Sequence, residues 1–189
     1  MTRKSKNAGV GRPGKSALNR RLLCAALARV EALKPAYDLF ASVVGWDGDR
    51  MFDRALEVCW QLAAGESTVL NADVWIERVD GCTPQPDPQG YYGAWPAFDA
   101  CIALTSVLEW LGEPTEDVLG TLDDIVAGGI DRHLEVLGAV GDETLYSDYQ
   151  HWIAALDTEL DHANGDARSL RRWQALQQYS TIGLLQEGG

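Results

Sequence analysis

The 189-residue chain is 46% hydrophobic, which suffices for one domain with its own core, so no metal or disulfide is needed to hold it together. No apolar run approaches the roughly 18 residues that span a bilayer, and the basic N-terminus lacks the apolar stretch and cleavage site of a signal peptide. The formal net charge of −12 disfavours binding to nucleic acid or anionic membranes and favours a basic protein partner.

Residues 1–16 are predicted to form a basic, flexible arm. The first 21 residues contain seven basic side chains and no acidic one, so residues 22–189 hold nine basic and 28 acidic side chains, a net charge of −19. Two interpretations of the arm stay open. It grips phosphate backbones or acidic surfaces without sequence preference, or it is a solubilising tail that folds back on the acidic domain.

The stretch "GVGRPGKS" at residues 9–16 matches the phosphate-loop pattern G-x-x-x-x-G-K-[ST]. A working phosphate loop follows a buried strand, whereas only the polar stretch "MTRKSKNA" precedes Gly9. Pro13 also lacks an N–H group that the phosphate cradle would use. We therefore interpret this match as a coincidence.

Residues 17–189 are predicted to form a single all-α domain, a bundle of about eight helices whose polar groups lie outside. Apolar residues recur at three- and four-residue steps, and capping residues mark several ends. Asp47 or Asp49 is expected to cap the third helix, and Asn71 the fourth. The first four predicted helices cover residues 15–32, 35–45, 47–65 and 71–79.

The proline-rich segment "GCTPQPDPQGYYG" at residues 81–93 is predicted to be an ordered, turn-rich connection or a mobile lid. The next helix, "AWPAFDACIALTSVLEWLG", begins near Pro96 and ends at Gly112; because it is apolar on nearly every side, it belongs in the centre of the fold. Two short helices separated near Gly128 and Gly129 follow. The last two predicted helices cover residues 143–165 and 166–180.

Three landmarks carry a family resemblance: "WQL" at residues 60–62, "PAFDACIAL" at 96–104 after the tyrosine-containing loop, and "STIGLL" at 180–185. In this order they resemble the bacterial YjaG-like family, domain of unknown function 416, over residues 20–185. The resemblance implies an all-helical cytosolic bacterial protein. It brings no established activity and no catalytic residue.

The four cysteines, Cys24, Cys59, Cys82 and Cys101, form no C-x-x-C pair, and three of them stand among apolar residues. Free cysteine is commonly buried, so we expect reduced core cysteines in a cytoplasmic protein. They indicate neither a disulfide framework nor a zinc site.

Two acid–histidine pairs have the i, i+3 spacing of metal ligands on a helix: Asp148 with His151, and Glu159 with His162. The two histidines are eleven residues apart on one helix, about 16 Å, which is too far for one metal centre. We therefore expect a solvated charged face here and predict no metal, no cofactor and no catalytic residue. Asp99 is expected in the first turn of its helix, where its charge meets the helix dipole; the alternative is a buried acid with a raised pKa.

Tyr91, Tyr92 and Trp95 are the candidate partner-binding residues, since exposed aromatic side chains often anchor protein partners. The alternative is that they fold inward over the end of the central helix. We predict a non-catalytic protein-binding module, of regulatory or inhibitor/immunity type, whose acidic surface binds a basic partner. The alternatives are a metal-dependent helical-bundle enzyme and a nucleic-acid-associated protein that uses the arm.

Overall fold

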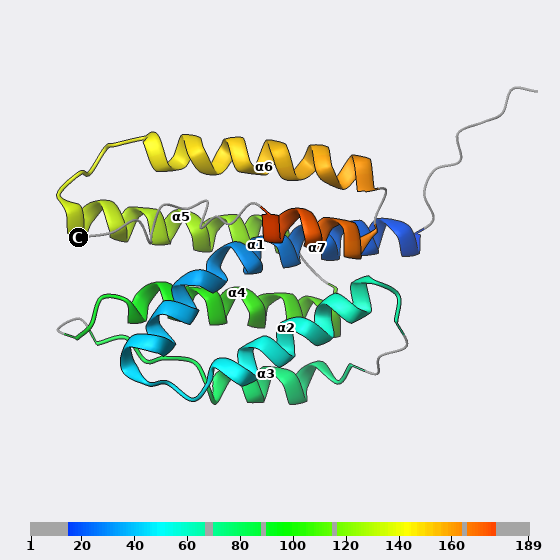
Figure 1. The fold of residues 1–189 in the computed structure, drawn as a ribbon, viewed down its shortest axis with the longest axis horizontal. Helices are drawn as coiled ribbons and strands as arrows, with labels where there is room; N and C mark the ends of the chain where they lie inside the picture. Colours follow the sequence, from blue (N-terminus) through cyan, green and yellow to red (C-terminus); the bar gives the residue numbers. More distant parts are fainter. Residues whose placement is uncertain (1–14, 67–69, 88–89, 115–116, 164–165, 177–189) are drawn as a thin grey trace, which may run out of the picture.

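The computed structural model describes residues 15–66, 70–87, 90–114, 117–163 and 166–176. These residues form seven helices and no strand, which confirms the all-α prediction (Figure 1). The phosphate-loop match lies outside them except for Lys15 and Ser16, which begin the first helix. The helices are α1 (Lys15–Val44), α2 (Asp49–Ala63), α3 (Ala72–Asp80), α4 (Ala94–Gly112), α5 (Val118–Leu137), α6 (Thr144–Ala163) and α7 (Ala167–Leu176).

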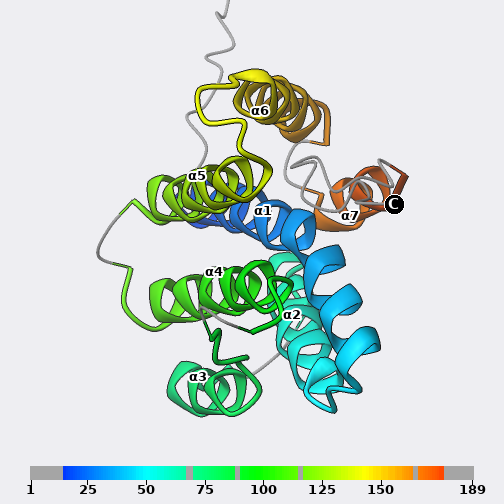
Figure 2. The same cartoon turned by 90° about the vertical axis from the view of Figure 1, so that its left-hand side faces the viewer.

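Helices α1 and α4 form the centre of the bundle. Helix α4 packs against α1, α2, α3 and α5, while α1 also contacts α6 and α7. Figure 2 shows α4 between α5 on one side and α3 on the other, with α6 outermost. The central position predicted for α4 is confirmed, and its buried residues include Ala97, Cys101 and Leu104, each 0% exposed.

The expected boundary at Pro35 is wrong, because Pro35 lies inside the single 30-residue helix α1. Proline removes one backbone donor and disfavours a helix interior. Residues on both sides of it, including Leu33 and Tyr37, are nevertheless buried in the core. Burial on both sides favours one continuous helix over a break at the proline.

The expected break near Gly128 and Gly129 is also wrong, since both glycines lie within α5. Each glycine costs a helix about 1 kcal/mol relative to alanine. The buried residues Val126, Ile130 and Leu134 recur every four positions along α5 and offset this cost by packing into the core. These two mergers reduce the nine helical segments expected along the chain to seven helices in the described residues, against a predicted bundle of about eight.

The residues predicted to mark helix ends were partly correct. The Asn71 side chain accepts a hydrogen bond from the backbone N–H of Val74 and so caps α3 as predicted. Gly65 follows α2 with a φ of +75°, a left-handed conformation that favours glycine. The expected Asp47 or Asp49 cap of α2 is wrong, because Gly48 occupies the N-cap position and makes no side-chain cap.

The core contains charged groups, contrary to the expectation that polar groups lie outside. The side chain of Arg29 on α1 is 5% exposed and pairs with Asp123 on α5 at 2.7 Å. Tyr149 on α6 donates a hydrogen bond to the same carboxylate. A hydrogen-bonded ion pair therefore ties three helices together at the edge of the core, where Arg29 is buried and the Asp123 side chain is 42% exposed.

All four cysteines are buried and free of disulfides, as predicted. None of the helices in the described ranges combines the length and apolar character needed to cross a bilayer.

Candidate functional site

The three predicted partner-binding aromatics do not form one surface. Tyr91 is 47% exposed and stacks on Phe40 at the end of α1, with ring centroids 6.4 Å apart. Tyr92 is partly buried against His133. Trp95 is partly buried as well, and the Arg132 guanidinium lies 5.5 Å from its ring centroid. Tyr91 is therefore the most exposed of the three aromatic residues.

Asp99 does not act at the helix terminus as expected. It is the sixth residue of α4 and the first turn contains no acid. Its side chain is 10% exposed and forms an ion pair with Arg132 on α5. Burial raises the pKa of Asp99, and the charge of Arg132 opposes this shift. The carboxylate therefore links two helices.

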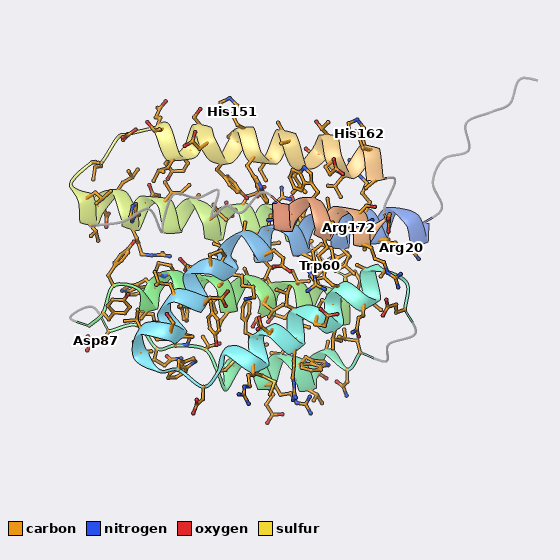
Figure 3. All side chains as sticks on the ribbon, viewed as in Figure 1. Arg20, Trp60, Asp87, His151, His162 and Arg172 are labelled. Atoms are coloured by element: carbon orange, nitrogen blue, oxygen red, sulfur yellow. The ribbon has the colours of Figure 1, made fainter. Side chains whose placement is uncertain are left out.

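The two acid–histidine pairs lie on the outer helix α6. Figure 3 shows the side chains of His151 and His162 pointing away from the rest of the bundle. His162 lies 3.9 Å from Glu159 on its own helix, and Asp148 is exposed. Within the described ranges, no three His, Cys, Asp or Glu side chains are grouped so that they could hold a metal ion. The structure brings none of the four residues to a metal-binding arrangement.

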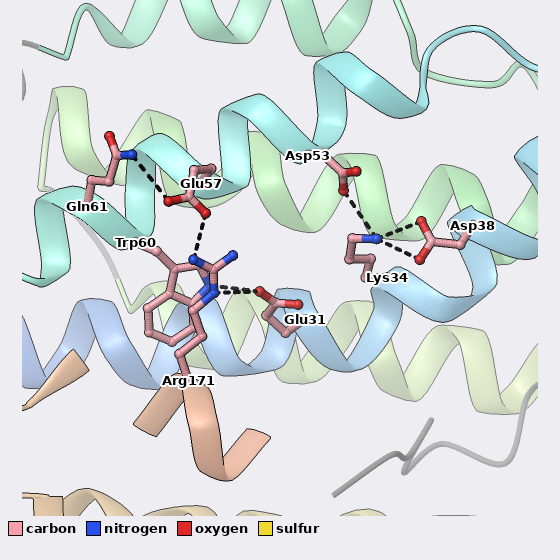
Figure 4. A network of polar contacts seen from close by, with 8 residues as sticks. All are labelled: Glu31, Lys34, Asp38, Asp53, Glu57, Trp60, Gln61 and Arg171. Atoms are coloured by element: carbon pink, nitrogen blue, oxygen red, sulfur yellow. Dashed lines mark hydrogen bonds and ion pairs between the residues drawn. The ribbon is translucent and has the colours of Figure 1, made fainter. Parts of the chain in front are cut away.

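A charge cluster, missed by sequence reasoning, joins α1, α2 and α7 (Figure 4). Arg171 of α7 reaches Glu57 at 2.6 Å and Glu31 at 3.7 Å, and its guanidinium lies 5.8 Å from the Trp60 ring centroid. The Trp60 indole donates to Glu31 at 2.9 Å. The charge cluster consists of Glu31, Lys34, Asp38, Asp53, Glu57, Trp60, Gln61 and Arg171.

Every acid of the charge cluster meets a cation. Lys34 pairs with Asp38 at 2.6 Å and with Asp53 at 3.1 Å. Burial raises the pKa of Glu31, and the nearby Arg171 charge limits the shift. The cluster borders a hollow of about 650 Å³, but each of its acids already faces Lys34 or Arg171.

A larger hollow of about 1010 Å³ lies between α3, the end of α4 and the start of α5. Its lining contains three exposed acids and no basic side chain. Among the described residues, none of these three acids forms an ion pair. We call this hollow the acidic groove and define it by Asp73, Ile76, Ser106, Glu109, Trp110 and Glu113.

Two acids of the groove stand at an unfavourable end of a helix. Glu109 lies in the last turn of α4 and Glu113 is its C-cap, and that turn contains no basic residue. The C-terminal end of a helix carries partial negative charge, so two carboxylates there are destabilising. The i, i+4 spacing of the pair adds like-charge repulsion. A cation bound in the groove would relieve both costs.

Sequence reasoning missed the groove, although one signal for it was available. "LEWLGEP" places two acids around the predicted helix end at Gly112, where Lys or Arg is favoured. That Asp73 lies across from them follows from the packing of α3 on α4.

Comparison with known proteins agrees with this architecture. A solved DUF416 family protein from Shewanella baltica OS155 has a TM-score of 0.76 and 20% identity, and the match covers 90% of this chain and 98% of that chain. "Uncharacterized protein YjaG" is 28% identical in Escherichia coli K12 and 27% identical in Salmonella typhimurium, in each case over 41% of this chain and 40% of the relative. The match thus spans about two fifths of these curated relatives.

Residues 17–183 match the family described as "Protein of unknown function (DUF416)". This match covers most of the chain and agrees with the predicted resemblance. The chain therefore belongs to the DUF416 family.

Proposed function

We propose that this chain is a non-catalytic binding module, of regulatory or inhibitor/immunity type, whose acidic groove holds a Lys- or Arg-containing segment of a partner protein. The observation that carries the proposal is the unpaired state of Asp73, Glu109 and Glu113 among the described residues. Elsewhere in the bundle, the half-buried or buried acids Glu31, Asp99 and Asp123 each meet an arginine.

The carboxylates and the aromatic ring of the groove both favour a basic segment as the occupant. A Lys or Arg side chain in the groove would meet carboxylates from α3 and from the end of α4. Trp110 in the lining adds an aromatic ring of the kind that attracts cations. The net charge of −12 would further speed the approach of a basic partner.

Tyr91 is a separate proposed contact. It precedes α4, whereas the groove acids Glu109 and Glu113 lie at the other end of this 19-residue helix. A helix of that length spans roughly 28 Å. A partner segment would need about eight or nine extended residues to reach both places.

The test is binding of a fluorescent lysine-rich peptide, followed by anisotropy at low and high salt. The groove variant combines Glu109→Gln with Glu113→Gln. The matched control combines Asp148→Asn with Asp157→Asn, which removes the same charge from exposed positions on α6. We expect the groove variant to weaken binding at least about tenfold, or 1.4 kcal/mol, and the control to change it much less.

Equal loss of binding in the two variants would show that the peptide senses net charge alone and would contradict a groove site. Failure of the unaltered protein to bind the peptide would contradict the proposal as well. Affinity purification from the native host then identifies the natural partner, which we expect to be basic and to dissociate at high salt.

A further inference from the structure

Large apolar side chains that are exposed gather at one end of the bundle. Eight large hydrophobic residues are exposed among the described residues, and seven of them stand near the end of α1, near the end of α5 or just before the start of α4. Figure 1 shows these three helix ends together at the left of the bundle, and Figure 2 turns that end toward the viewer. Single exposed apolar side chains are ordinary, whereas a gathered set marks a contact surface.

The end of α5 supplies the most exposed part of this surface. Val136 and Leu137 are the last two residues of α5, and Val140 lies in the turn that follows. They are 63%, 63% and 77% exposed, and no other large hydrophobic residue in the described part of the chain reaches these values. Aliphatic side chains this open to water gain free energy when a partner covers them.

Aromatic contacts join the end of α5 to the end of α1. Tyr91 stacks on Phe40 of α1 with ring centroids 6.4 Å apart, and the next residue, Tyr92, packs against His133 near the end of α5 with centroids 6.3 Å apart. The last two turns of α1 add three exposed aliphatic residues: Leu39, Val43 and Val44. We call this surface the apolar end face and define it by Leu39, Val43, Val44, Tyr91, Val136, Leu137 and Val140.

The charges around the apolar end face are acidic. The stretches that supply it contain no Lys or Arg: residues 35–49, 79–131 and 133–167. Four exposed acids stand within three residues of its members: Asp47, Glu135, Asp142 and Glu143. Among the described residues, none of these four acids forms an ion pair. A second copy of the chain would bring the same acids to this rim, so charge repulsion disfavours self-association there.

We propose that the apolar end face is a docking surface for a segment of a partner protein in which apolar side chains are flanked by Lys or Arg. The apolar side chains would cover the aliphatic residues and Tyr91, and the flanking cations would meet the four acids. This gives the apolar centre and polar rim that protein interfaces have. The face lies at the start of α4 and the acidic groove at the end of α4, so this proposal and the proposed function can fail separately.

The experiment compares two fluorescent peptides by anisotropy. In the first, Leu and Lys alternate at helical spacing; in the second, Gln replaces every Leu, so the charge is the same. We expect the unaltered protein to bind the Leu-containing peptide at least about tenfold more tightly, because only that peptide can cover the apolar end face. Val136→Gln combined with Leu137→Gln and Val140→Gln should remove most of this preference and leave binding of the Gln-containing peptide unchanged.

Val74→Gln is the matched control for Val140→Gln alone. Val74 is the eighth exposed large hydrophobic residue, and it lies on α3, outside the apolar end face. Each substitution replaces one exposed valine, so neither disturbs the core. We expect Val140→Gln to weaken binding of the Leu-containing peptide about threefold and Val74→Gln to leave it unchanged.

Two other occupants are tested with the same triple variant. A dimer of the unaltered protein in sedimentation velocity that becomes a monomer in the variant would assign the face to a second copy. Binding to phosphatidylcholine vesicles that the variant loses would assign it to a lipid surface. Either result, or equal affinity of the unaltered protein for the two peptides, would overturn the proposal.

Discussion

The charge cluster and the acidic groove contain similar side chains in opposite states. In the charge cluster, Arg171 and Lys34 face four carboxylates across three helices. In the groove, three carboxylates meet no cation from the described residues, and two of them stand at the negative end of α4. The first arrangement stabilises the fold, and the second costs stability. A surface that costs stability in the free protein is a candidate for binding.

The largest expected change in stability comes from a substitution that breaks the charge cluster. Arg171→Ala removes the cation that faces Glu31 and Glu57 and that stacks on Trp60. The Glu31 side chain is only 18% exposed, so its charge would be left without its partner. We expect the free energy of unfolding to fall by about 2 kcal/mol, less than for a fully buried pair because Arg171 is partly exposed. Urea denaturation measures this change.

Arg168→Ala is the matched control for that variant. Arg168 lies on the same helix and pairs with Glu66, but its side chain is 74% exposed. We expect a much smaller change in the free energy of unfolding, because solvent screens an exposed pair. Equal effects of the two substitutions would show that the partial burial of the charge cluster adds nothing to stability.

In the acidic groove, removing charge is expected to raise the free energy of unfolding. Glu109→Gln combined with Glu113→Gln removes two negative charges from the C-terminal end of α4. We expect the free energy of unfolding to rise by about 1 kcal/mol, since each charge at a helix end contributes roughly 0.3–1 kcal/mol. The pair Asp148→Asn and Asp157→Asn, in the interior of α6, should change stability much less. A destabilised groove variant would contradict the unfavourable placement of these acids.

A smaller effect concerns pH and Glu31. Burial raises the pKa of Glu31 above its ordinary value of 4.5. A raised folded-state pKa means that folding favours the protonated form, so this contribution is present below pH 4.5 and is lost as pH rises through the folded pKa. Glu31→Gln lacks it. We therefore expect the stability of wild type relative to this variant to decrease over that window, as chemical denaturation at a series of pH values would show.

The smallest expected effect is that of salt on the stability difference between wild type and the groove variant. The groove acids are exposed, so added sodium chloride screens their repulsion. We expect the stability difference between wild type and the Glu109→Gln, Glu113→Gln variant to shrink by less than about 0.5 kcal/mol. A difference that grows with salt would point to a cause other than exposed charge.

Local patterns predicted much of the fold. The apolar positions Phe52, Leu56 and Cys59 follow the three- and four-residue steps of a predicted helix, and all are buried. Asn71 and Gly65 marked true helix ends. The predicted ends at Pro35 and at Gly128 were wrong because burial on both sides of each position outweighs a local cost of a few kcal/mol.

The candidate sites were much less predictable. Arg171 and Glu57 are 114 positions apart, and no spacing rule joins them. The same holds for Asp73 opposite the end of α4. Tyr91, Tyr92 and Trp95 are adjacent in the chain but point to different neighbours, because Arg132 and His133 of α5 take up two of them. Whether the three bind a partner stays a prediction.

The sequence by itself determined the helical class, the register of the buried faces and the excess of acid, since these follow from hydrogen bonding and side-chain spacing within a few residues. Only the tertiary structure decided which acids find a cation. Those pairings depend on where helices cross, and the crossing positions are set by packing over the whole core. The acidic groove exists because α3 and α4 meet where neither supplies a positive charge.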